Sequence, residues 1–163
     1  MKEYLDIVND NDEVIGKRLR SDAHERQLLH RVSLIFCFED ETEKKLLIQK
    51  RSELCDVAPS KLSIPGGHVN SGENYKSAAV REFLEEENGK SDLFEWFKFK
   101  SSSDGSPKFV TVFKTYNKGP FIDQEDEVEE SYFKDMKNLQ EDVLQNPKEY
   151  TEIIIDSFKQ IFK

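Results

Sequence analysis

Four glutamates lie within six positions of the stretch VREFLEEENGK, residues 80–90. A helix is expected to end here, and its carbonyl end already carries a partial negative charge of about half an elementary unit. Glutamates three or four positions apart also repel each other, by about 0.2–0.5 kcal/mol per pair. At about 100° per residue, Glu82, Glu85 and Glu86 project from one side of this helix, whereas Glu87 points away and is predicted to be solvated. The first three acids therefore form a candidate cation-binding face.

This acidic face borders the apolar side of the same predicted helix, on which Tyr75, Ala78 and Ala79 lie. Carboxylates beside an apolar stripe are partly desolvated, which costs several kcal/mol unless a cation compensates. A bare run of glutamates in a charge-rich chain is more often a solvated helix face, so the run alone favours the plainer interpretation. The flanking residues shift the balance toward a cation site.

The flanking residues follow a fixed spacing: Gly67, five residues, Glu73, seven residues, then Arg81 and Glu82. The complete pattern, G-x5-E-x7-R-E-F-x-E-E, resembles the signature of the Nudix hydrolases, which act on a nucleoside diphosphate linked to another moiety. The family usually has glycine two residues after the paired glutamates and then an aliphatic residue, whereas this chain has Asn88 and Gly89. Asparagine is the next-best residue for the left-handed end of a helix, so the helix end should survive.

The resemblance implies a role for each position of the motif. Glu82, Glu85 and Glu86 would bind one or more Mg²⁺ or Mn²⁺ ions, with the carbonyl of Gly66 as a further ligand, because hard divalent ions favour oxygen donors. Glu85 and Glu86 would also be catalytic, in a reaction where metal-activated water attacks a phosphorus of the diphosphate. The remaining members of the motif would brace the loop and the helix: Gly67, Glu73 and Arg81.

A second acidic segment, DQEDEVEESYF (123–133), offers the additional glutamate that these enzymes often place after the motif. Glu127 and Glu130 fit the E-V-x-E spacing of the family and are candidate catalytic residues. A solvated acidic loop is the alternative interpretation for each of them. Lys50, Arg51 and His68 are candidate substrate contacts, and a solvated strand end explains Lys50 and Arg51 equally well.

The three histidines, His24, His30 and His68, stand in a second family context. The stretch from NDEVIGKRLR to LLIQKRS resembles the N-terminal half of the isopentenyl-diphosphate isomerase-like branch of the superfamily, in which histidines at about these positions help to hold a metal. The cysteine that the isomerases place before the glycine–histidine pair is absent from SIPGGH (63–68). The isomerases also have a metal-binding acidic pair on the strand that should correspond to PKFVTVF (107–113), which has no acid here. Isomerisation needs a proton donor and a proton acceptor on opposite faces of the carbon skeleton.

These departures favour a metal-dependent pyrophosphohydrolase over the two alternatives. One alternative is an isopentenyl-diphosphate isomerase-like enzyme, and the other is a catalytically silent nucleotide-sensing module. The intact REFLEE (81–86) argues against the silent module, because a pure binder gains little from clustered acids.

Composition limits the class of protein further. The chain has 163 residues, 35% of them charged, and a net charge of −9. No apolar run approaches the roughly 18–20 residues that span a bilayer, and the N-terminus lacks the layout of a signal peptide, so a cytoplasmic location off the membrane is expected. The acidic balance argues against a nucleic acid polymer as partner, and two cysteines make no disulfide framework. The expected partner is a small-molecule diphosphate substrate; its identity and a homodimer stay open.

The elements that must position these residues are mostly strands. A hairpin is predicted for 3–20, a helix capped by Asn74 for 74–88, a helix capped by Asp135, and a last helix that starts at Asn146 and includes Tyr150. Further strands are predicted for 31–38, 45–51, 62–65, 93–100, 108–116 and 128–133. This order predicts an α/β (α+β) fold, a Nudix-type α/β/α sandwich with a mixed β-sheet, in one domain over residues 1–163 whose motif occupies about 67–89.

Overall fold

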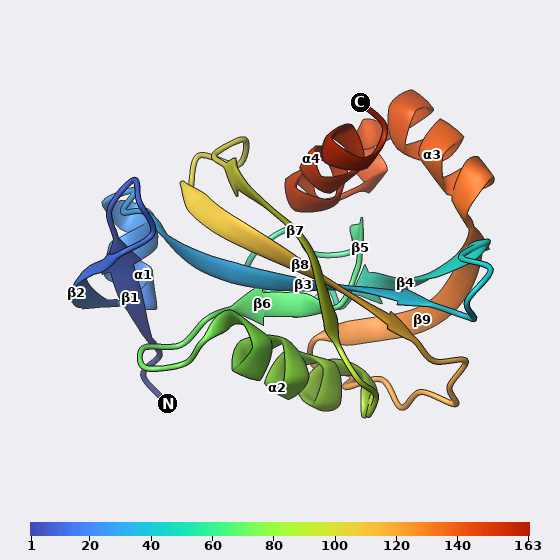
Figure 1. The fold of residues 1–163 in the computed structure, drawn as a ribbon, viewed down its shortest axis with the longest axis horizontal. Coiled ribbons are helices and arrows are strands. Elements are labelled where there is room, and N and C mark those ends of the chain that lie inside the picture. Colours follow the sequence, from blue (N-terminus) through green and yellow to red (C-terminus); the bar gives the residue numbers. More distant parts are fainter.

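A nearly continuous apolar run forms strand β3 (His30–Phe38), which lies at the centre of the main sheet in the computed structural model of residues 1–163 (Figure 1). Consecutive residues of a strand point to opposite faces, so β3 contributes to two separate cores. Leu34 and Phe36 join one apolar cluster, and Ile35 and Cys37 join the other. The strand predicted over 31–38 is therefore confirmed.

The main sheet has seven strands, in the order β5-β4-β3-β8-β7, with β6 paired to β3 and β9 paired to β4. Strand β3 runs parallel to β8 and antiparallel to β4 and β6, so the sheet is mixed, as predicted. The other strands are β4 (Lys45–Arg51), β5 (Leu62–Ser63), β6 (Gly66–His68), β7 (Phe94–Ser101), β8 (Lys108–Tyr116) and β9 (Val128–Asp135).

Helices cover both faces of this sheet and give three layers (Figure 1). Helix α2 (Tyr75–Glu87) packs on one face through Ala79 and Phe83. Helices α3 (Met136–Gln145) and α4 (Glu152–Ile161) pack on the other face, where Leu139 and Phe158 belong to the larger core. The predicted α/β/α sandwich is confirmed, and none of its helices is long and apolar enough to cross a membrane.

The N-terminal hairpin is a separate two-stranded sheet made of β1 (Tyr4–Val8) and β2 (Val14–Leu19). It continues into helix α1 (Arg20–Glu25), which the sequence analysis does not predict, and Leu5 and Ala23 belong to a small core of its own. At the hairpin turn the Asp12 carboxylate accepts hydrogen bonds from Arg31 (2.7 Å) and from the hydroxyl of Tyr75 (2.9 Å). The hairpin is thereby attached to both β3 and the start of α2.

Helix α2 begins and ends where its capping residues predict. The side chain of Asn74 accepts a hydrogen bond from the backbone N–H of Ser77 at 2.8 Å. Asn88 adopts the left-handed conformation at the other end, with φ of 51°. Any Cβ at Gly89 would lie 2.5 Å from the ring of Phe83, so no side chain fits where the family has an aliphatic residue.

Two predicted elements differ from the structure. Asp135 caps α3 as expected, but Pro147–Glu149 form only a 3₁₀ turn and α4 starts at Glu152. Tyr150 is fully buried and forms a bridge with Leu62 of β5, which holds the chain extended before the last helix. The short strand predicted over 62–65 is also different, because only Leu62–Ser63 form β5. Residues Gly66–His68 form a separate strand that pairs with β3.

Candidate functional site

Three carboxylates from two distant segments meet at one end of α2. Glu82 and Glu86 come from the helix, Glu127 comes from the loop before β9, and each pair of these acids has oxygens within 4.8 Å. Glu86 is only 4% exposed, whereas Glu127 is exposed. The structure therefore brings together two acids of the predicted metal face and one of the two downstream candidates.

Burial sets the electrostatics of this carboxylate cluster. It raises the pKa of Glu82 to about 7, although the adjacent guanidinium of Arg81 opposes the shift. Burial also raises the pKa of Glu86 well above its ordinary range, and the charge of Glu82 adds to the shift. Mutually repelling carboxylates that are partly removed from water are stabilised by a divalent cation, and oxygen donors are those that Mg²⁺ and Mn²⁺ prefer. The donor set fits such an ion.

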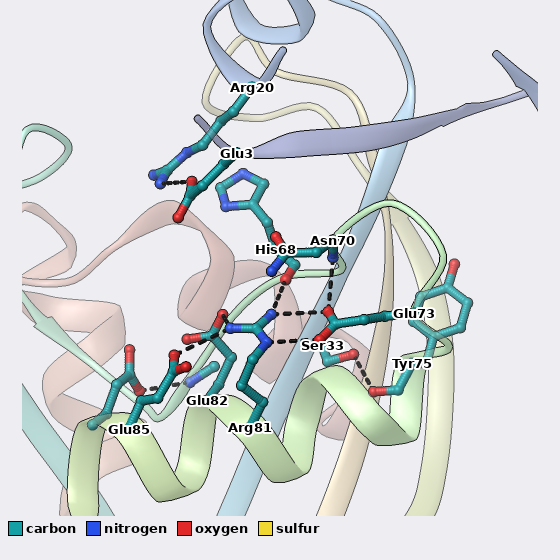
Figure 2. A network of polar contacts seen from close by, with 12 residues as sticks. Glu3, Arg20, Ser33, His68, Asn70, Glu73, Tyr75, Arg81, Glu82 and Glu85 are labelled. Atoms are coloured by element: carbon teal, nitrogen blue, oxygen red, sulfur yellow. Dashed lines mark hydrogen bonds and ion pairs between the residues drawn. The ribbon is translucent and has the colours of Figure 1, made fainter. Parts of the chain in front are cut away.

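Arg81 connects the loop before α2 to this cluster (Figure 2). Its guanidinium donates to Glu73 (2.7 Å) and to the carbonyl of His68 (3.0 Å) on one side, and to Glu82 (2.7 Å) and Glu85 (3.2 Å) on the other. A planar guanidinium with several donors suits such a junction. These contacts match the bracing role expected of Arg81 and Glu73.

The two glycines of β6 allow the loop to approach the acids closely. A Cβ on Gly67 would lie 2.4 Å from a carboxylate oxygen of Glu82, so a side chain there would displace that acid. The backbone N–H of Gly66 donates to Glu86 at 3.0 Å. A metal contact through the Gly66 carbonyl stays a prediction.

The other two acids proposed as catalytic lie outside the cluster. The side chain of Glu85 is 53% exposed and forms an ion pair with Arg81. Glu130 is exposed on β9, in register with Lys50 of β4. Neither acid belongs to the group formed by Glu82, Glu86 and Glu127, and their catalytic role stays a prediction.

A cleft of about 430 Å³ opens over the carboxylate cluster. Cationic side chains of Arg51 and Lys61 line it together with apolar side chains such as Leu54 and Val57. Lys50, the other predicted phosphate contact, pairs with Glu129 at 2.9 Å and does not line the cleft. The mixture of charged and apolar walls suits a small molecule with an anionic part and a less polar part.

The three histidines also meet, at another part of the same cleft wall. His24 comes from α1, His30 begins β3 and His68 ends β6, and their ring nitrogens lie within 4.8 Å of one another. The Nε2 atoms of His24 and His68 are 2.9 Å apart. His24 and His68 line the cleft, whereas His30 is fully buried behind them.

The protonation of this histidine cluster is defined by its surroundings. The Nδ1–H of His30 donates to the carbonyl of Leu28 at 2.8 Å, which leaves Nε2 buried without a hydrogen-bond partner. Burial lowers the pKa of His30 to about 4, and burial also lowers the pKa of His24 and of His68. The three imidazoles therefore favour the neutral form, and their ring nitrogens lie within 4.8 Å of one another, a donor type and spacing that suit a transition metal ion.

The position of Glu87 differs most from its prediction. It is predicted to be solvated, but it is fully buried. Its carboxylate accepts hydrogen bonds from the amide of Gln49 (2.9 Å) and the hydroxyl of Ser131 (2.8 Å). Helical periodicity cannot show that a later loop and β9 cover this side of α2. One feature of the sequence indicated a buried polar partner: Gln49 is two positions after Leu47 on an apolar strand, so both side chains point to the same face of the sheet.

Comparison with known proteins assigns residues 28–152 to the NUDIX domain family. An uncharacterized Nudix hydrolase of Yersinia pestis is 34% identical over 131 residues, which cover 78% of this chain and 70% of that protein. An uncharacterized Nudix hydrolase of Streptomyces coelicolor is 40% identical over 92 residues, but the match covers only 56% of this chain and 49% of that protein.

Among solved structures, a protein of Deinococcus radiodurans superposes with a TM-score of 0.85 at 24% identity, over 99% of this chain and 100% of that one. A MutT protein of Methanosarcina mazei gives a TM-score of 0.66 at 19% identity, over 81% and 91% of the two chains. At these identities the superpositions show the shared fold.

Proposed function

Because the chain belongs to the Nudix family, we propose that it is a metal-dependent pyrophosphohydrolase that cleaves the diphosphate of a small molecule. The observation that carries this proposal is the meeting of Glu127 with Glu82 and Glu86 beside a cleft with cationic walls. Glu82 and Glu86 belong to the motif, whereas Glu127 lies some forty residues later and meets them only in the folded chain. Its position therefore supports the proposal independently of the motif.

The three acids would hold one or more Mg²⁺ or Mn²⁺ ions. Bound there, the ions would lower the pKa of the attacking water and neutralise charge on the phosphate oxygens. The protein's own groups have separate tasks. Gly66 fixes the Glu86 carboxylate through its backbone N–H, and Arg81 orients Glu82. Arg51 and Lys61 would bind phosphate oxygens from the cleft wall.

Glu127 is the proposed proton acceptor for the attacking water. It is the exposed member of the carboxylate cluster, so a water molecule can reach it, whereas Glu86 is buried. Glu85 is held in an ion pair with Arg81, which makes it a less available base. Glu130 would then be dispensable.

The test is a phosphate-release screen with dinucleotides, nucleoside triphosphates, nucleotide sugars and prenyl diphosphates, with Mg²⁺ and with Mn²⁺. Glu86→Gln should lower turnover of any accepted substrate by a factor on the order of 10²–10³, because a charged group at the reacting centre is lost. Glu141→Gln, an exposed acid on α3, is the matched control and should match the wild type. Unchanged turnover in Glu86→Gln would remove the carboxylate cluster from the reaction.

The second candidate is an isopentenyl-diphosphate isomerase-like enzyme, and the histidine cluster is the observation that favours it. The resemblance to the isomerase branch implies a metal at these three histidines, and the close spacing of their ring nitrogens, with His30 Nε2 buried and unpaired, supports one. Against this candidate, β8 supplies no acid over Lys108–Tyr116, and Gly66 stands directly before Gly67 where the isomerases have a cysteine. Interconversion of isopentenyl and dimethylallyl diphosphate without phosphate release would favour it over hydrolysis.

A catalytically silent nucleotide-sensing module is the remaining alternative. It predicts that nucleotides raise the unfolding temperature while no phosphate is released in the screen. The buried position of Glu86 weighs against it, because an acid held out of water without a cation destabilises the fold.

A further inference from the structure

Glu87 occupies a position that the family signature leaves free, yet it is 0% exposed. An acid removed from water is costly unless its oxygens are hydrogen-bonded, so its surroundings indicate what it does. One carboxylate oxygen accepts two hydrogen bonds, from the Gln49 amide at 2.9 Å and from the Ser131 hydroxyl at 2.8 Å. Gln49 and Ser131 are directly opposed on β4 and β9, so Glu87 joins the helix to both strands.

The Gln49 amide is shared between Glu87 and the metal-site acid. Its nitrogen lies 2.9 Å from the Glu87 carboxylate and 3.3 Å from that of Glu86. The same Glu86 oxygen accepts the backbone N–H of Gly66 at 3.0 Å. Two donors from different elements therefore restrain one oxygen of Glu86, and Glu87 determines where one of those donors lies.

The loop that carries Glu127 is attached at the same place. The backbone N–H groups of Ile122 and Gln124 donate to the carbonyls of Glu87 and Glu86, both at 3.1 Å. Between them, the Asp123 carboxylate accepts the backbone N–H of Ser131 at 3.1 Å. The loop thus joins α2 through two backbone hydrogen bonds and β9 through the Asp123 side chain.

This attachment extends to the cluster itself. Three residues after Gln124, the backbone N–H of Glu127 donates to the Gln124 carbonyl at 2.8 Å, and the Glu127 carbonyl accepts the N–H of Ser52 at 3.0 Å. Hydrogen bonds and short covalent stretches therefore connect the Glu87 carboxyl, through Ser131, Asp123 and Gln124, to the Glu127 backbone. If the loop separates from α2, Glu127 loses its position opposite Glu82 and Glu86.

We propose that Glu87 is a positioning residue for the metal site: with Gln49 and Ser131, it fixes the Glu86 carboxylate and holds the 121–127 loop so that Glu127 faces α2. This inference rests on the proposed function, because it assumes that Glu82, Glu86 and Glu127 hold the ion. It assigns to Glu87 neither metal contact nor substrate contact.

The test compares Glu87→Gln with Glu87→Leu. Glutamine keeps the size of the side chain and an oxygen that accepts from Gln49 and Ser131. Leucine leaves those donors unpaired. The control is Glu125→Gln, which removes an exposed charge from the same loop.

The first readout is amide hydrogen exchange of Ile122 and Gln124 without metal, and the second is Mn²⁺ affinity from the free-Mn²⁺ signal in electron paramagnetic resonance. In Glu87→Leu we expect at least tenfold faster exchange and Mn²⁺ binding weaker by about 10–100-fold, the range for a supporting group behind a metal ligand. Glu87→Gln should stay within about threefold of the wild type in both readouts, and so should Glu125→Gln.

Two results would overturn the inference. Wild-type exchange and Mn²⁺ affinity in a folded Glu87→Leu protein would show that the carboxyl holds nothing in place. Equal defects in Glu87→Gln and Glu87→Leu would show that the charge, and not the hydrogen bonding, matters. A different result would reject the proposed function instead: Mn²⁺ affinity that is the same in the wild type and in Glu86→Gln, while exchange at Ile122 and Gln124 still responds to Glu87.

Discussion

The carboxylate cluster and the histidine cluster lie along one cleft but are built in different ways. Two of the three acids come from consecutive turns of one helix, and only Glu127 arrives from elsewhere. The three histidines come from α1, β3 and β6, so each belongs to a different element. The first group can largely be recognised in a local motif, whereas the second exists only when the N-terminal hairpin is docked on the main sheet.

The donor atoms of the two clusters also differ. Carboxylate oxygens match hard ions such as Mg²⁺, whereas neutral imidazoles match transition metals such as Co²⁺ and Zn²⁺. One cleft therefore contains two donor clusters with different metal preferences, and we expect single substitutions to affect either cluster without the other.

Of the substitutions that sharpen this comparison, the one with the largest expected effect separates Glu127 from Glu130. We expect Glu127→Gln to lower kcat by a factor on the order of 10², because the proposed proton acceptor is lost, and Glu130→Gln to stay within about threefold of the wild type. Both substitutions remove one charge from the same acidic segment. Steady-state kinetics at saturating Mg²⁺ would measure the difference. Equal losses would mean that the charge of the segment matters rather than membership of the carboxylate cluster.

A second substitution addresses the histidine cluster. His24→Gln should weaken Co²⁺ binding by at least about 10-fold, measured from the visible absorption of the bound ion, since one of three imidazole donors is lost. The partial exposure of His24 makes this variant less disruptive than one at the fully buried His30. Mn²⁺ affinity at the acids should not change. Loss of both affinities together would mean that the cleft holds one site and not two.

The smallest effect is expected at an ion pair remote from both clusters, which serves as a reference for ordinary charge pairing. Hydrogen bonds from Lys134 and from the Tyr150 hydroxyl lower the pKa of Asp142 to about 2 from the usual 3.8. Since the unfolded chain holds this proton more tightly, the contribution to stability is complete above about pH 4 and is lost as the pH falls toward 2.

Asp142→Asn should therefore lower the free energy of unfolding by about 1 kcal/mol at neutral pH, a value kept small because the Asp142 side chain is 31% exposed. Urea unfolding at pH 7, 4 and 2.5 would measure it. The gap between variant and wild type should narrow at pH 2.5, and a gap that stays constant with pH would contradict the electrostatic explanation.

The parts of the site that sequence could predict are those with local causes. Asn74 and Asn88 cap α2 because their side chains suit the two helix ends, and Glu82 and Glu86 face the cleft because helical spacing places them there. The parts that escaped prediction depend on distant segments. Glu87 is buried by a loop some forty residues later, and Thr151 rather than Asn146 precedes the last helix because Tyr150 pairs with β5.

The choice between Glu127 and Glu130 is one that the sequence left open. The E-V-x-E spacing offered Glu127 and Glu130 alike, and the face on which a strand residue lies is known only once the strand register is known. The chain turns into β9 at Val128, so Glu127 stays in the loop beside α2 while Glu130 projects from the strand. That residues 1–163 form a single domain stays a prediction.

The attachment of α2 to the 121–127 loop has a consequence for biosynthesis. A protein emerges from the ribosome N-terminus first, so α2 with its acids is made well before the residues that cover and complete it. Until Ile122, Gln124 and Ser131 have emerged, the carbonyls at the end of α2 and the carboxyl of Glu87 must be hydrated by water. The carboxylate cluster is thus completed late in synthesis, and a nascent chain that stops before the 121–127 loop carries the whole motif without Glu127.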